Sequence, residues 1–215
     1  MKMASRSLLT CQFLRMRAVV LLACGRPDAA LARFEQILRL RPLDHHALAS
    51  RAHLHAQRGS FDKAIESLHL LTQTCPQASS GWFNLGYALQ QLGQQGQAGV
   101  AFRSALTIDP RMDRAWYGLA LVLMDSRLFE GAADALEKNT ALQPMSPHGW
   151  FKLAQVRQAL EQHDEAFKIV LHLRQFEPKV AAQLEKTLGL GLRSNSSQED
   201  RDMTAVTTRA ARHAA

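Results

Sequence analysis

The chain has 215 residues, of which 47% are hydrophobic and 21% charged, a composition typical of a soluble globular protein. Three cysteines without a C-x-x-C pair exclude a readable disulfide framework or zinc site, and they fit a reducing, cytoplasmic location. The net charge of +7 lies at one end: residues 1–60 hold ten Lys or Arg and three acids, and the remainder balances. A basic end attracts acidic proteins, nucleic acid or anionic lipid.

The N-terminal segment allows two interpretations. Residues 1–10 show no distinct pattern and form a lead-in. The sequence MRAVVLLACG, Met16–Gly25, resembles a bacterial lipoprotein cleavage box with Cys24 as the lipidated residue. Its apolar run is shorter than a signal h-region of roughly 7–15 residues, although two arginines precede it. Because no run approaches a membrane helix, membrane association is expected only if Cys24 is lipidated.

A period of 34 residues organises most of the chain. Five of the seven prolines and five alanines keep this period. They are Pro42, Pro76, Pro110, Pro144 and Pro178, and Ala30, Ala64, Ala98, Ala132 and Ala166. The period predicts a repeat architecture, in which each copy buries its apolar face only against its neighbours.

The third copy indicates the role of each position. It predicts a helix A at Ser79–Leu92 and a helix B at Gln95–Ile108. Gly86 lets the two backbones approach, and Gly93 ends helix A in a left-handed conformation. The period places Gly25 and Gly59 at the position of Gly93 in the first two copies, but it places Arg127 and Glu161 there in the last two. Whether those two turns differ is left open.

The same copy carries a family resemblance. Trp82-x-x-Leu85-Gly86 followed by Ala98-x-x-x-Phe102 resembles the tetratricopeptide repeat, with Leu89 in place of the pattern's Tyr. The resemblance covers residues 11–178. It implies an all-α, right-handed superhelical solenoid with a C-terminal capping helix at 180–190 and a disordered tail at 193–215. The implied repeats are 11–44, 45–78, 79–112, 113–146 and 147–180.

The resemblance also implies where function lies. In such arrays the A helices line a concave groove that binds a partner segment. The fifth residue of each repeat faces that groove, which predicts an apolar stripe of Phe83, Tyr117 and Phe151 with Tyr87 one turn from Phe83. Polar groove positions are Asn84, Arg114 and Lys152, which form a partial anion grip. Arg15, in the first repeat, is expected to steer an acidic partner.

Other site types find no support in the sequence. There is no G-x-S-x-G elbow, H-E-x-x-H motif, phosphate loop or dinucleotide fingerprint, so we expect neither an enzyme nor a cofactor. The clustered histidines His45, His46, His53 and His55 lack the i, i+4 pairing of a helical metal site. Nucleic-acid binding is not expected, because the basic region has no interleaved aromatic residues.

The sequence therefore predicts a non-catalytic adaptor, scaffold or assembly factor. Its partner is a protein or peptide, either acidic or an amphipathic helix, held in the groove. Two alternatives stay open. One is a lipid-anchored envelope assembly factor that resembles pilus-biogenesis lipoproteins, and the other is a secretion-type chaperone.

Overall fold

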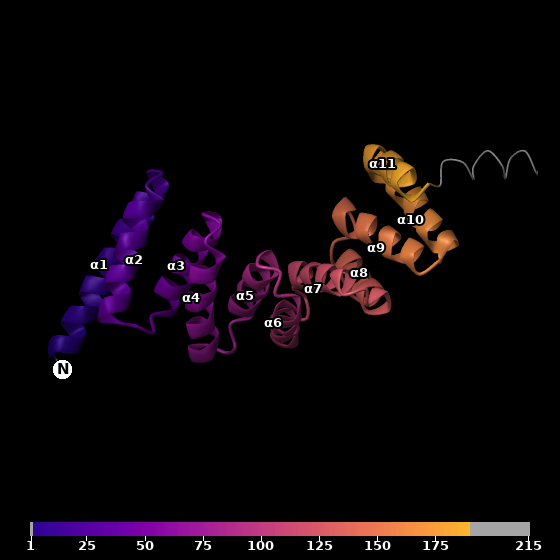
Figure 1. The fold of residues 1–215 in the computed structure, drawn as a ribbon. Coiled ribbons are helices and arrows are strands. Elements are labelled where there is room, and N and C mark those ends of the chain that lie inside the picture. The colour runs from indigo at the N-terminus through magenta and orange to yellow at the C-terminus, as the bar shows by residue number, and fades with distance from the viewer. Residues whose placement is uncertain (1, 190–215) are drawn as a thin grey trace, which may run out of the picture. The chain divides into compact units, whose positions relative to one another are not determined.

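The computed structural model describes residues 2–189, and this range consists of helices joined by short connections, without a strand (Figure 1). Side chains are described from Leu8 onward. The chain divides into two compact units, Met1–Leu128 and Phe129–Ala215, which we describe separately. The tail expected at 193–215 lies outside the described residues.

Between residues 2 and 128, the first unit contains seven helices. They are α1 (Lys2–Ala23), α2 (Pro27–Leu40), α3 (His45–Gln57), α4 (Phe61–Thr74), α5 (Ser79–Gln91), α6 (Gln95–Ile108) and α7 (Asp113–Asp125). From Lys2 onward, the residues that we set apart as a lead-in belong to α1. This first A helix is therefore longer at its N-terminus than the period implies.

The described part of the second unit contains four helices. They are α8 (Phe129–Leu142), α9 (Pro147–Ala159), α10 (His163–Phe176) and α11 (Pro178–Leu188). The expected capping helix corresponds to α11, which begins two residues earlier than predicted and ends at Gly189 in a left-handed conformation. None of the helices within residues 2–189 has both the length and the hydropathy needed to cross a membrane.

The periodic prolines lie directly after the B helices. The helices α4, α6 and α8 end two residues before Pro76, Pro110 and Pro144, since proline supplies no amide proton to continue a helix. The carbonyl oxygens of these prolines accept hydrogen bonds from the indole Nε1 of tryptophans in the following A helices, at 2.8–2.9 Å. The repeated tryptophan therefore fixes the connection between one repeat and the next.

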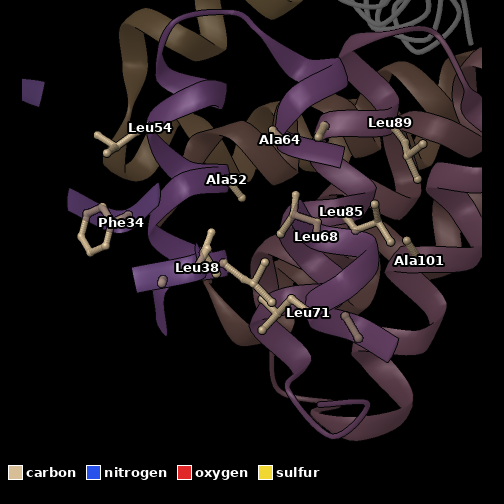
Figure 2. Close-up of a cluster of buried hydrophobic side chains, with 14 of the residues drawn as sticks. Phe34, Leu38, Ala52, Leu54, Ala64, Leu68, Leu71, Leu85, Leu89 and Ala101 are labelled. Atoms are coloured by element: carbon tan, nitrogen blue, oxygen red, sulfur yellow. The ribbon is translucent and has the colours of Figure 1, made fainter. Parts of the chain in front are cut away.

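A continuous apolar core fills the first unit (Figure 2). Its largest fully buried side chains are Phe34, on α2, and Phe102, on α6. A Cβ atom on Gly86 would lie 2.8 Å from the Phe102 ring, and one on Gly118 would lie 2.6 Å from it. Glycine is thus required on both α5 and α7, because both backbones closely approach the same ring. Gly118 itself is buried.

The helix A–B turns of the last two repeats do not differ from the others. Arg127 and Glu161 adopt φ angles of 58° and 59°, close to the 72° of Gly93. A side chain in this left-handed region costs about 1 kcal/mol or more, because Cβ crowds the following carbonyl oxygen. These two turns are therefore strained.

We expect Arg127→Gly and Glu161→Gly each to raise the free energy of unfolding by about 0.5–1 kcal/mol, since relief of strain exceeds the added entropy of the unfolded glycine. Urea denaturation followed by circular dichroism measures this change. Gly93→Ala is the matched control, because its new Cβ would meet no atom within 4 Å and adds only strain. Gly93→Ala should lower the free energy of unfolding by a similar amount. Destabilisation by Arg127→Gly would contradict the strain argument.

Candidate functional site

The first unit contains a pocket of about 390 Å³ lined by α3, α5 and α7, with Leu68 of α4 at its base. Ala52 and Ala56 of α3 supply small apolar groups to its wall. Four of the predicted groove residues line it: Phe83, Asn84, Tyr87 and Arg114. The structure therefore brings these four side chains together from two successive A helices.

Phe83 connects the pocket to the core. Its ring is half-buried and packs against the Phe102 ring with centroids 6.0 Å apart. The guanidinium of Arg114 lies 5.1 Å from the centroid of the Phe83 ring. This cation–π geometry is worth about 0.5–1 kcal/mol at an exposed site. The aromatic ring thus positions the cation at the edge of the pocket.

Asn84 and Tyr87 form the exposed side of the pocket. Tyr87 is 44% exposed, and its ring meets the Phe61 ring edge-on with centroids 6.2 Å apart. Asn84, on the same helix, is exposed and carries both a donor and an acceptor. The pocket therefore offers apolar rings, a cation, an amide and a phenol, which suit recognition of a mixed polar and apolar segment.

Sequence reasoning missed two polar residues of this pocket, His53 and Gln57 of α3. His53 precedes Tyr87 by one 34-residue period, and Gln57 lies one turn further along the same helix. The position of Tyr87 could have identified His53, but the sequence offers aromatic rings as the clearer signal. At this position the second repeat contributes the imidazole of His53 to the pocket, and the third contributes the phenol ring of Tyr87.

Tyr117 lies on α7, three residues after Arg114, and does not line the pocket. It is half-buried, and this burial raises the pKa of its phenol. The fold thus favours the protonated phenol over the phenolate. Phe151 and Lys152 are half-buried residues of α9 in the second unit. The continuous stripe and the three-residue anion grip remain predictions, since they join residues of both units.

Arg15 has a structural contact that the sequence did not indicate. Its Nη2 lies 3.1 Å from both carboxylate oxygens of Asp44. Asp44 is buried and also accepts a hydrogen bond from the Ala47 amide at the start of α3. The ion pair thus joins α1 to the α3 N-cap. The charge of Arg15 is offset by this carboxylate, and Arg15 lies outside the pocket lining.

Cys24 is exposed directly after α1. Cleavage before it would remove α1, which contributes the buried residues Cys11, Leu14 and Ala18 to the core. The apolar face of α2 would then lie open to solvent.

The clustered histidines belong to no metal-ligand group, since the described residues include no set of three His, Cys, Asp or Glu side chains able to hold an ion. Burial lowers the pKa of His55, and the neighbouring cations Lys63, Arg51 and Arg58 lower it further, against Glu35. The fold thus favours the neutral imidazole of His55.

His46 behaves in the same way. Burial is the main cause of its lowered pKa, Arg15 adds to it and Asp44 opposes it. Both rings bind a proton more readily in the unfolded chain. Their contribution to stability is therefore present above the unfolded value near 6.5 and is lost as the pH falls below it.

We therefore expect a double substitution of these histidines, His46→Gln with His55→Gln, to reduce the fall in melting temperature between about pH 7.5 and 5.5. Thermal denaturation of both proteins at each pH measures the difference. The carboxylates contribute equally to the pH dependence of the melting temperature in both proteins. The difference between the two proteins therefore reports the titration of the two imidazoles. An unchanged or larger fall in the double variant would contradict the assignment.

Comparison with protein families identifies the repeats. Models of the tetratricopeptide repeat match residues 15–79 and 79–112. Anaphase-promoting complex subunit 3 of Schizosaccharomyces pombe is 22% identical over 152 residues. These residues represent 71% of this chain and 23% of that relative, so the chain spans less than a quarter of the relative's length.

Solved structures show the same fold. MamA from Desulfovibrio magneticus RS-1 is 19% identical, with a TM-score of 0.74, over 79% of this chain and 96% of that one. YrrB, described as a tetratricopeptide repeat protein with an unusual peptide-binding site, is 15% identical, with a TM-score of 0.71, over 80% of this chain and 90% of that one.

The two family models meet at residue 79, the first residue of α5. They cover α2 to α6 and therefore include most of the pocket lining. The all-helical architecture agrees with the solenoid fold of the solved structures. In other proteins such repeats act as protein-interaction modules. Residues 15–112 thus match the tetratricopeptide repeat, and the chain resembles proteins built from this repeat.

Proposed function

We propose that the chain binds a segment of a partner protein in the pocket between α3, α5 and α7. The observation that carries this proposal is the convergence of Phe83, Tyr87, Asn84 and Arg114 on one cavity. The apolar rings provide contact area, and the amide and guanidinium fix the orientation of the bound segment through hydrogen bonds. The unusual peptide-binding site of YrrB, a protein with the same fold, supports a peptide as the ligand.

The partner segment is acidic where it meets Arg114. This cation lies at the edge of the pocket, and its nearest described interaction is with an aromatic ring. A carboxylate can therefore bind the guanidinium without displacing an internal ion pair. The apolar part of the segment lies over Phe83 and Tyr87, so a short helix or extended segment with one acidic and one apolar side fits both.

A paired capture experiment tests this proposal. The immobilised full chain is incubated with source lysate, and retained proteins are identified by mass spectrometry. The test variant carries Asn84→Ala, Tyr87→Ala and Arg114→Ala, all exposed positions whose loss leaves the core intact. Phe83 is left in place because it packs on Phe102.

The control variant carries Val100→Ala, Arg103→Ala and Thr107→Ala, which match the test residues in exposure and character on α6. A partner that binds wild-type and control proteins but not the pocket variant supports the proposal. A partner that all three retain equally would place the binding surface elsewhere on the chain. Circular dichroism verifies that all three proteins are folded.

A further inference from the structure

The outward face of α1 has the character of an interface. Leu9, Phe13, Met16 and Val20 follow one another at helical spacing and are 65%, 58%, 68% and 60% exposed. Val19 beside them is 55% exposed. Because the opposite face of α1 is also apolar and forms part of the core, the helix carries apolar side chains on both sides. A terminal repeat of a solenoid normally presents a polar outer face.

The repeat register shows what these positions do elsewhere. In the four later repeats, the position of Phe13 is occupied by Ala47, Gly81, Ala115 and Gly149. The position of Val20 is occupied by Leu54, Ala88, Val122 and Val156. All eight residues are buried. A Cβ on Gly81 would meet Leu71 of the preceding α4, and Val122 lies beside Gly99 of the preceding α6. Phe13 and Val20 therefore occupy the positions that later repeats use to contact the previous B helix.

A further repeat does not fit this face in the usual way. The position of Phe13 holds only Ala or Gly in the other four repeats, and a Cβ on Gly81 would already lie 3.3 Å from Leu71. A phenylalanine ring would hold an approaching B helix away from α1. Head-to-tail stacking of a second copy is therefore disfavoured on steric grounds.

The charge of α1 disfavours a symmetric pairing as well. The helix contains no acidic residue. Among its basic residues from Leu8 onward, Arg15 is paired with Asp44, which leaves Arg17 as the cation beside this face. The guanidinium of Arg17 lies 5.6 Å from the centroid of the Phe13 ring, at the border of the apolar face. Two such helices placed face to face would bring like charges together. The occupant of this face is therefore anionic as well as apolar.

We propose that α1 docks on an anionic lipid surface. Interfacial helices insert an apolar face at the boundary between headgroups and acyl chains and attract anionic lipid through nearby cations. The outward face of α1 offers these two features, while its opposite face stays packed in the core. Phe13, Met16 and Val20 enter the boundary between headgroups and acyl chains, and Arg17 meets the lipid phosphates. A lipid surface deforms around Phe13, whereas a packed helix cannot. A shallow concavity of about 520 Å³ runs along this helix beside Gln12, Met16 and Val20.

Vesicle flotation with the full chain tests this proposal. Intact mass first verifies an unmodified chain, which separates the proposal from lipidation at Cys24. We expect at least about tenfold more protein bound to vesicles of phosphatidylcholine with about 30% phosphatidylglycerol than to pure phosphatidylcholine, with loss of binding at high salt.

Two variants locate the contact. Phe13→Ser with Val20→Ser should reduce binding at least about tenfold, since two apolar anchors are lost. Val100→Ser is the control, because this valine is 59% exposed on α6 and receives the same polarity change. It should bind as the wild type does.

Three outcomes would overturn the proposal: no binding to the anionic vesicles, equal loss in the control variant, or a concentration-dependent dimer that Phe13→Ser with Val20→Ser abolishes. The last result, measured by light scattering without lipid, would assign the face to a second copy of the chain.

Discussion

Replacement of Phe102 by alanine is expected to lower the free energy of unfolding of the first unit by about 3–5 kcal/mol, the usual cost of removing a buried phenylalanine. Phe102 is 1% exposed, and its ring fills the space left by Gly86 on α5 and Gly118 on α7. Neither glycine can extend into the cavity that the substitution creates. The surrounding helices are therefore expected to fill little of the cavity. The loss of free energy of unfolding should lie at the upper end of this range.

Two measurements check this expectation. Chemical denaturation gives the free energy, and hydrogen exchange shows where protection is lost. Since each repeat is stabilised mainly by its neighbours, the loss should concentrate in α5, α6 and α7 rather than in α1 and α2. Val100→Ala on the same helix is the control and should change stability by less than about 0.5 kcal/mol. Equal effects of the two substitutions would contradict the packing described here.

Reversal of the charge at Arg114 is expected to weaken binding of the captured partner at least about tenfold, which corresponds to about 1.4 kcal/mol. The guanidinium faces the pocket over the Phe83 ring. A glutamate there would repel an acidic segment and lose the cation–π contact. Arg114→Lys should cost less, because it retains the charge but loses the planar stacking.

Calorimetric titration of each variant with the purified partner measures these differences. Because Arg114 is exposed, we expect Arg114→Glu to lower the free energy of unfolding by no more than about 1 kcal/mol, the size of the lost cation–π contact. Binding should also weaken as salt is raised, and this dependence should be smaller in Arg114→Ala. An Arg114→Glu protein that binds as tightly as the wild type would show that the segment is not held by this cation.

The repeat period allowed the helices to be predicted closely. The A and B helices of the third repeat, expected at Ser79–Leu92 and Gln95–Ile108, are observed at Ser79–Gln91 and Gln95–Ile108. Proline and left-handed glycine act locally, so their positions determine where helices end. The strain at Arg127 could not be predicted, because an arginine side chain carries no local preference for the left-handed conformation that glycine adopts at this position.

The candidate site was less accessible to sequence reasoning. The aromatic residues of the third repeat, Phe83 and Tyr87, were predicted from its sequence. Arg114 was predicted from its position in the fourth repeat. The pairing of Arg15 with Asp44 depends on how the end of α2 brings the α3 N-cap beside α1, which no local pattern shows. Arg51 stands where later repeats bury leucine, and its Nε donates to Ser67 at 2.9 Å. Such compensating pairs join two helices and become visible only in the structure.

Crosslinking from inside the pocket tests the central claim most directly. Benzoylphenylalanine is placed at Tyr87 in one protein and at Val100 in another, both exposed positions in the first unit. After irradiation with the captured partner, mass spectrometry identifies the linked peptides. We predict that position 87 links to one short acidic and apolar segment of the partner and that position 100 does not link to it. Crosslinks from position 100 alone would show that the partner binds outside the pocket.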